Sequence, residues 1–193
     1  MGFESNGRPC AIPAEARPNV FALVIYIPEP LGPFLDDLRR ELVPGCNPHA
    51  HVSVLPPRVL SVDWHTASEE ARVLAEGWMP FDVELTNVEI FPKTDVIYLE
   101  VGAGVAELRG MHEAMNTGAM EFREPYSYQP HITLAQEIDH KEVSRLHELA
   151  VRRWREWRGP RTFRAERAVF VQNIRANIWV DLATYALGAV PVR

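Results

Sequence analysis

The sequence predicts an α+β protein built as a bilobal, pseudo-symmetric duplication, in which two antiparallel sheets face a central cleft and carry helices on the outside. The first observation is a motif of histidine, apolar residue and hydroxyl residue that occurs at 51–53 and again at 131–133. The second is the order of patterns around each copy: a helix, the histidine strand, another helix and two strands. A repeated order of elements predicts two similar lobes with one histidine strand in each.

The ordered part of the first half begins with a strand. Residues 19–28 form a continuous apolar, β-branched run that ends at a proline, which is typical of a buried strand. A helix is expected at 31–45, because Pro33 suits a first helical turn and a leucine stripe leads to a Pro-Gly stop. The first histidine strand, at 48–57, follows this helix.

The first half continues with a second helix and a hairpin. Residues 66–78 predict the helix, with Thr66 or Ser68 as its N-cap. Alternation of apolar and polar residues over 81–92 indicates a strand, and 95–104 is its expected hairpin partner.

The second half repeats this order. The expected elements are a helix at 105–118, the second histidine strand at 129–136, a long amphipathic helix at 140–157, and two strands within 161–187 around a polar stretch at 173–177. We therefore expect one bilobal domain over 19–187, with a flexible N-terminal tail at 1–18 and a C-terminal tail at 188–193.

Composition narrows the classes of partner and location. The net charge of −6 and the pI of about 5.7 disfavour binding to long duplex nucleic acid, but they allow a small phosphorylated nucleotide or an RNA end. No apolar run of about 18 residues is present, so no membrane partner is expected. The two cysteines, Cys10 and Cys46, make no disulfide framework, which predicts a reducing, cytoplasmic location. We expect a monomer.

The histidine strands carry the candidate chemistry. Side chains two apart in a strand point to the same face, so His51 shares a face with Ser53. His131 shares a face with Thr133 in the same way. Two imidazoles across one cleft suit acid–base catalysis, because histidine titrates near neutral pH. The hydroxyl groups suit anionic oxygens of a phosphate held between them. This chemistry needs no metal and no cofactor.

A structural interpretation competes with this one. If only one motif were present, the simpler interpretation would be a structural histidine with a hydroxyl group nearby. The pair in matched places of the repeat favours a functional site. "HELAV" at 147–151 lacks the second histidine of a zinc-peptidase motif, and His65 and His112 are expected at the surface. In the basic segment 152–167, inward packing of the tryptophans is favoured over an RNA-binding track.

The motifs "HVSV" and "HITL" resemble those of the two-histidine phosphoesterases, most of all the 2'-5' RNA ligase and RNA 2',3'-cyclic phosphodiesterase branch. The resemblance covers roughly residues 19–187. It implies that His51 and His131 are the catalytic pair and that Ser53 and Thr133 bind phosphate. It further implies cleavage of 2',3'-cyclic phosphates to 2'-phosphates and, in some members, reversible joining of RNA ends by a 2'-5' linkage.

The chain departs from the family pattern at several candidate substrate-binding positions. Ser53 stands where threonine is commoner, and Gln136 stands where some members have an arginine. Arg58 is either the replacement for that charge or a solvated loop residue.

Two tyrosines before the second motif are also candidates for the cleft. Tyr126 and Tyr128 either stack on a base there or pack in the core or at the rim. The competing function is a module of the same fold that binds a nucleotide or RNA end without turnover.

Overall fold

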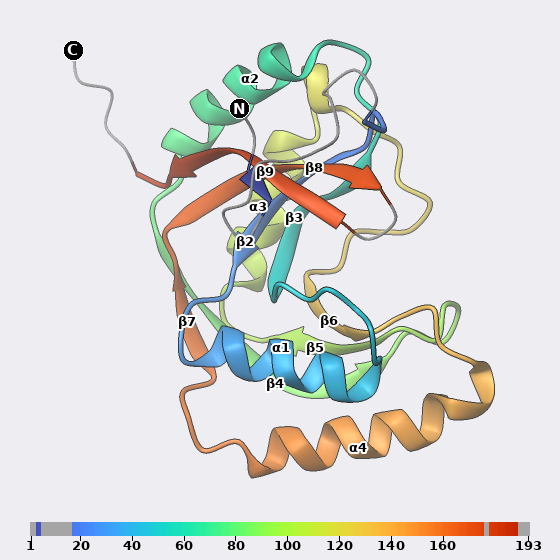
Figure 1. Cartoon of the computed structure of the whole chain (residues 1–193). Helices are drawn as coiled ribbons and strands as arrows, with labels where there is room; N and C mark the ends of the chain where they lie inside the picture. The colour runs from blue at the N-terminus through green and yellow to red at the C-terminus, as the bar shows by residue number, and fades with distance from the viewer. Residues whose placement is uncertain (1–2, 5–16, 176–177, 189–193) are drawn as a thin grey trace.

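Two antiparallel sheets form the frame of the molecule (Figure 1). The computed structural model describes residues 3–4, 17–175 and 178–188. The first sheet has the order β1 (Phe3–Glu4), β9 (Ile178–Ala186), β8 (Arg167–Arg175), β2 (Phe21–Tyr26) and β3 (His51–Arg58). The second sheet has the order β6 (His131–Ala135), β5 (Ile97–Val101), β4 (Phe81–Ile90) and β7 (Thr162–Ala165). The predicted α+β class with two facing sheets is confirmed.

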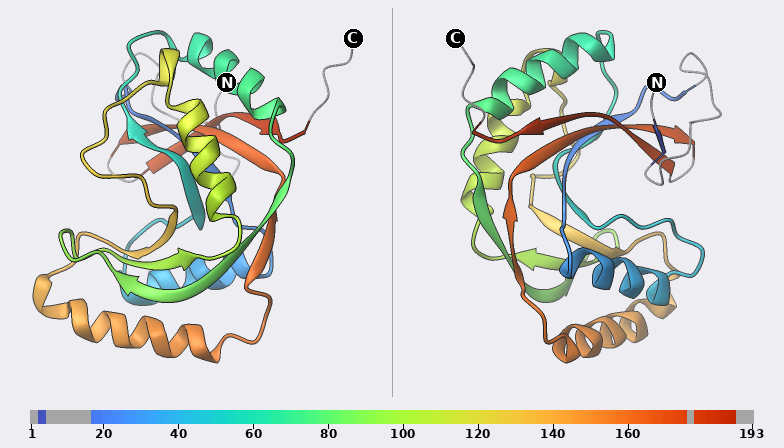
Figure 2. Two further views of the ribbon diagram at one scale, coloured as in Figure 1. Left: turned by 180° about the vertical axis from the view of Figure 1, so that it is seen from behind. Right: turned by 60° about the vertical axis from the view of Figure 1, so that its left-hand side comes forward.

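The helices cover the outer faces of the sheets, as expected (Figures 1 and 2). They are α1 (Leu31–Leu42), α2 (Trp64–Glu76), α3 (Val105–Met115) and α4 (Val143–Glu156), with short 3-10 helices at Gly118–Met120 and His140–Glu142. α1 and α4 lie against the second sheet, whereas α2 and α3 lie against the first. Because α1 follows β2 and α3 follows β5, each of these helices crosses to the sheet that does not contain the strand before it.

The lobes are not the two halves of the chain, which refines the expected duplication. β8 and β9, from the end of the chain, complete the first sheet beside β2. The two strands expected in 161–187 are in fact three, because β7 pairs with β4 and the chain then passes at Glu166 into the other sheet. One residue, Glu166, separates β7 from β8. Because it is neither Gly nor Pro, the sequence gives no turn signal there.

The leucine stripe of α1 packs into the core as predicted, and Leu31, Leu35, Leu38 and Leu42 are all buried.

The predicted N-cap of α2 was wrong. Asp63 caps this helix instead, since its carboxylate accepts hydrogen bonds from the backbone N–H groups of His65 at 3.0 Å and Thr66 at 3.2 Å. The helix begins at Trp64, two residues before the predicted start, and an aspartate at the N-cap is as favourable as a serine.

Two residues of the expected N-terminal tail form a strand. Phe3 and Glu4 make β1, which pairs with Val180 and Asp181 of β9. Residues 5–16 and 189–193 lie outside the described residues, so most of both predicted tails does too. No helix in the described ranges is long and apolar enough to cross a membrane.

The topology brings the two histidine strands together. β3 is the last strand of the first sheet, and β6 is the last strand of the second. These two edge strands contact each other between the sheets. Motifs that are far apart in the sequence therefore meet at one place in the molecule.

Candidate active site

The two histidine strands have the same pattern of burial. In β3, His51 and Ser53 are partly exposed, whereas Val52 and Val54 are fully buried. β6 repeats the pattern, because His131 and Thr133 are partly exposed between buried apolar residues. The alternation expected from the sequence is thus present in both strands. Each strand turns its imidazole and its hydroxyl to the open side and anchors itself with its aliphatic side chains.

Three of the four motif side chains line one cavity. Ser53, His131 and Thr133 border a space of about 590 Å³. Its other walls come from the end of β3 and from the segments 91–96 and 122–129. His51 is not among the lining residues. It shares a face of β3 with Ser53 and so lies just beyond the cavity, toward the start of that strand.

Both imidazoles are held in the same way by the backbone. His51 Nδ1 lies 2.6 Å from the carbonyl oxygen of His49, and His131 Nδ1 lies 2.7 Å from that of Gln129. A carbonyl oxygen can only accept, so Nδ1 is the donor in each ring. The hydrogen bond therefore fixes the tautomer and leaves Nε2 to take up or release a proton.

The environment keeps both histidines neutral. The pKa of His51 is lowered to about 4, chiefly by burial; the hydrogen bond to the His49 carbonyl raises it, and electrostatic effects of Arg39, His49 and His131 act in the lowering direction. Burial also lowers the pKa of His131, again against a raising hydrogen bond, that to Gln129. At neutral pH both rings can therefore accept a proton at Nε2.

Aromatic rings that were not among the predicted site residues flank each histidine. The Tyr26 ring meets His51 edge-on at 6.4 Å, and its hydroxyl donates to Asp181 at 2.6 Å. Tyr98 and Phe91 meet His131 edge-on at 5.4 and 4.9 Å. Both tyrosines lie on the strand that pairs with a histidine strand, which is the signal that was available.

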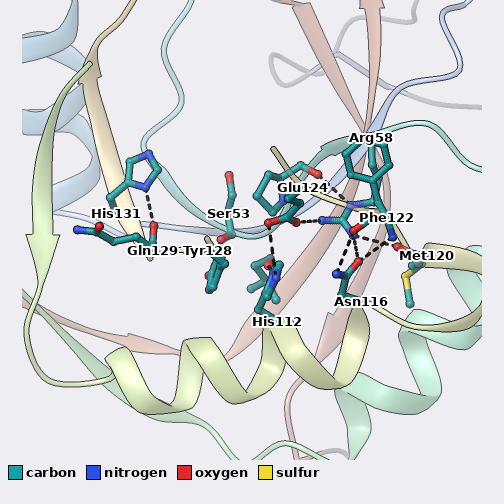
Figure 3. A network of polar contacts seen from close by, with 12 residues as sticks. Ser53, Arg58, His112, Asn116, Met120, Phe122, Glu124, Tyr128, Gln129 and His131 are labelled. Atoms are coloured by element: carbon teal, nitrogen blue, oxygen red, sulfur yellow. Dashed lines mark hydrogen bonds and ion pairs between the residues drawn. The ribbon is translucent and has the colours of Figure 1, made fainter. Parts of the chain in front are cut away.

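The predicted tyrosines both line the cavity, but in different ways. Tyr126 is exposed, and the ammonium of Lys93 lies 6.0 Å from its ring centre. Tyr128 stacks on His112 at 3.8 Å and donates its hydroxyl to the backbone carbonyl of Ser53 at 2.8 Å (Figure 3). Gln136 is exposed at the cavity border. Tyr128 thus ties the cavity wall to the first histidine strand.

Arg58 is neither a solvated loop residue nor a free cation. It is the last residue of β3 and is only 3% exposed. Its guanidinium donates to the Asn116 side chain at 2.7 Å, the Met120 carbonyl at 2.9 Å and the Glu124 carboxylate at 2.6 Å (Figure 3). These contacts use its donors within the protein, so Arg58 supports the cavity wall from behind.

His112 belongs to the same network, and its expected position at the surface was wrong. Its side chain is 12% exposed. Nδ1 donates to the Val54 carbonyl at 2.8 Å, and Nε2 lies 3.6 Å from Glu124. Glu124 thus sits between Arg58 and His112, and this connects α3 to β3 beneath the cavity (Figure 3). A lone histidine in a helix pattern gives no hint of partners so distant in the sequence.

The tryptophans of the basic segment pack inward, as favoured. Trp154 is buried, and the Arg161 guanidinium lies 4.5 Å from its ring centre. Trp157 stacks on Phe34 at 4.3 Å. Across the described part of the chain, no group of three or more His, Cys, Asp or Glu residues is arranged to hold a metal ion.

Fold and site together define a class of protein: two facing sheets, each ending in a strand that carries a His-x-Ser/Thr motif. The family model of the 2'-5' RNA ligase superfamily matches residues 27–177. The chain belongs to this superfamily.

A curated relative is similar in sequence, and solved structures share the fold. A protein of Oceanobacillus iheyensis with the provisional name of phosphoesterase is 31% identical over 101 residues, which are 48% of this chain and 59% of that protein. The crystal structure of Escherichia coli LigT complexed with 3'-AMP matches with a TM-score of 0.60 at 14% identity, over 88% of this chain and 98% of LigT. Usb1 from Kluyveromyces marxianus matches with a TM-score of 0.56 at 13% identity, over 90% and 100% of the two chains.

Proposed function

We propose that this protein is a metal-independent phosphodiesterase that opens 2',3'-cyclic phosphates on RNA ends or nucleotides, with His51 and His131 as general base and general acid. One observation carries the proposal. Each imidazole donates from Nδ1 to a carbonyl two residues upstream, presents Nε2, and has a hydroxyl two residues downstream on the same face. This matched arrangement lies beside a cavity of about 590 Å³, large enough for a nucleoside.

The reaction follows from the two Nε2 atoms. The neutral imidazole takes a proton from a water molecule as the water oxygen bonds to phosphorus. The bond from phosphorus to the 3' oxygen breaks, and the protonated imidazole gives its proton to that oxygen. The product is a 2'-phosphate, and the two rings have exchanged protonation states. The same opening with a 5'-hydroxyl as the nucleophile in place of water would give a 2'-5' linkage, again with the 3' oxygen leaving and taking up the proton.

The two histidines are assigned by their surroundings. The pKa of His51 is lowered to about 4, chiefly by burial and with the Arg39 cation acting in the same direction, so we assign it as the base. His131 is assigned as the acid. An anionic phosphate beside it favours the charged imidazolium and raises its pKa in the complex.

The hydroxyl groups and the cavity complete the proposed site. Ser53 and Thr133 donate to the non-bridging phosphate oxygens, where charge builds up in the transition state. Tyr126 and Tyr128 offer ring faces for the base of the nucleotide. Support comes from LigT, which has the same fold and has been crystallised with 3'-AMP and with NADP+.

The test is the release of 2'-phosphate from the four 2',3'-cyclic nucleotides in the presence of EDTA, with the products separated by chromatography. The proposal predicts activity that EDTA leaves intact and that His51→Ala or His131→Ala removes. His65→Ala is the matched control, because this histidine is exposed on α2, where its ring stacks on Trp64 and lies 3.5 Å from the Asp63 carboxylate. Nucleotide binding without turnover in the wild type would favour the competing function of a binding module. Activity lost in EDTA and restored by zinc or magnesium would contradict the metal-independent mechanism.

A further inference from the structure

Arg39 on α1 is a half-buried arginine whose donors are not fully used. Its Nε atom is buried and has no hydrogen-bond partner among the described residues. Its neighbour Arg40 is different, because it is exposed and pairs with Asp37 at 2.7 Å. Burial lowers the pKa of Arg39, although Cys46 and Asp36 act in the opposite direction. A buried donor without a partner is costly, and an incoming anionic oxygen would relieve that cost.

The position of Arg39 is set by how α1 docks. The Asp36 carboxylate accepts a hydrogen bond from the Ala50 N–H at 2.7 Å, directly before His51. Residues three apart lie on the same face of a helix, so Arg39 follows Asp36 on the side that faces the start of β3. α1 also packs against β6, the strand of the second histidine. α1 therefore presents Arg39 to the place where the two histidine strands meet.

The charge of Arg39 reaches the proposed base. It is among the positive charges that lower the pKa of His51. His49, His131 and the ring of Tyr26 also face His51, as does the backbone carbonyl of His49. Asp181 lies behind Tyr26, whose hydroxyl donates to it at 2.6 Å. The motif hydroxyls of Ser53 and Thr133 bring no charge, and Lys93 lies at the cavity wall over Tyr126. Arg39 is thus a permanent cation close enough to His51 to act on a phosphate held beside that ring.

We propose that Arg39 is a phosphate-binding residue of this site. Its guanidinium donates to non-bridging oxygens of the phosphoryl group held beside His51, on the side opposite the cavity. The proposal rests on the proposed function for the identity of the anion. It adds a positive charge that neither histidine motif contains, and it places the base of the nucleotide and the extra cation at opposite ends of the site.

The first measurement is the affinity for inorganic phosphate by calorimetry at pH 8, where both imidazoles are neutral. Arg39→Gln should weaken binding about 10- to 100-fold, as expected for the loss of a charge-assisted hydrogen bond. Arg39→Lys should lie between Arg39→Gln and the wild type, because it keeps the charge but loses the planar donor pair. Arg40→Gln removes the same charge one residue away on the exposed face and should leave the affinity unchanged.

The second measurement is an NMR titration of the His51 ring, which does not depend on any enzymatic activity. Removing a nearby cation should raise the pKa of His51 in Arg39→Gln but not in Arg40→Gln. Circular dichroism and thermal unfolding check that both variants fold. Equal phosphate affinities in the Arg39→Gln and Arg40→Gln variants would overturn the proposal, as would a wild type that binds no phosphate at millimolar concentrations. If phosphate binds and depends on Arg39 while no cyclic phosphate is cleaved, this inference stands and the proposed hydrolysis fails.

Discussion

One backbone carbonyl beside each histidine fixes the tautomer and the orientation of its imidazole ring. Because the carbonyls of His49 and Gln129 occupy Nδ1 of the following histidine, proton exchange is restricted to Nε2 in both rings. A ring free to rotate would present either nitrogen and would lose orientation toward a phosphate. The alternation of the strands supplies the matching hydroxyl for each ring. In the proposed mechanism, the orientation of both imidazoles thus comes from the local backbone.

Replacing either histidine should abolish most of the proposed activity. His51→Ala and His131→Ala should each lower kcat by about 10²- to 10⁴-fold, since each removes one proton transfer. The double variant should lose much less than the product of the two losses, because the residues act as a unit. Steady-state kinetics on 2',3'-cyclic nucleotides provide the measurement. A single variant with nearly wild-type kcat would mean that this histidine is structural.

The pH dependence should be shifted to acid. In the free protein the pKa of His51 is lowered to about 4, and the pKa of His131 is lowered as well. The active form needs one neutral and one protonated imidazole, so kcat/KM should be bell-shaped with its maximum below the ordinary histidine pKa of about 6.5. Above the higher of the two apparent pKa values the acid is lost, and below the lower one the base is lost. These values belong to the pair. A kcat/KM that rises steadily to pH 9 would contradict the assignment.

What the sequence could predict at this scale was the alternation within each strand. His51 with Ser53, and His131 with Thr133, followed from the two-residue period. The partners of Arg58 and His112 did not, because Asn116, Glu124 and Val54 reach them only through tertiary packing. Arg39 was likewise hidden as one of two adjacent arginines on a helix. Only the docking of α1 distinguishes it from Arg40.

At the scale of elements, a buried ion pair holds the segment that forms the cavity wall. Arg58 at the end of β3 binds Glu124 and the Met120 carbonyl, and Glu124 in turn lies next to His112 of α3. The segment 116–128 has only the short 3-10 helix at 118–120, so these contacts replace the backbone ladder that a strand would provide. Tyr128 adds a hydrogen bond back to β3.

Breaking this pair should be costly. Arg58→Met leaves the Glu124 carboxylate buried without its partner, so the free energy of unfolding should fall by about 3–5 kcal/mol. Urea denaturation measures the change. Arg40→Met, at an exposed pair, should change stability by about 0.5 kcal/mol or less. Combining Arg58→Met with Glu124→Leu should recover much of the loss. Equal effects of Arg58→Met and Arg40→Met would show that the network contributes little to stability.

Element types were largely predictable, and sheet membership was not. The patterns at 31–45 and 140–157 predicted helices because their apolar residues recur every three or four positions, whereas those of a strand recur every two. The run at 161–175 reads as a single strand, yet β7 and β8 belong to different sheets. The local pattern of apolar residues predicts which face of a strand is buried. It does not report which of two sheets provides the partner, and that choice depends on distant strands.

At the scale of the whole molecule, each sheet draws on segments far apart in the chain. The first sheet joins β2 and β3 to β8 and β9, and the helices α1 and α3 cross to the opposite sheet. The core of one lobe is therefore continuous with that of the other, and one cluster of buried apolar side chains extends through both. Neither lobe is built from one continuous stretch of the sequence.

This continuity predicts cooperative unfolding of both lobes. Buried amides of β8 in the first sheet and of β4 in the second should exchange with solvent at the same free energy of opening, within about 1 kcal/mol. Native-state hydrogen exchange followed by NMR makes the comparison. Exchange of one strand through an opening that is more than about 2 kcal/mol cheaper would reveal a lobe that unfolds alone.

The same topology constrains how the protein is made on the ribosome. β2 is a central strand that needs β8 on one side, and β8 is synthesised about 140 residues after β2. At about 5–20 residues per second, the edge of β2 waits roughly 7 to 30 seconds for its partner. During that interval an apolar strand offers unpaired N–H and C=O groups to other nascent chains, a recognised route to aggregation. Early chaperone engagement and slower synthesis should therefore change the soluble yield of this chain more than point changes on its surface.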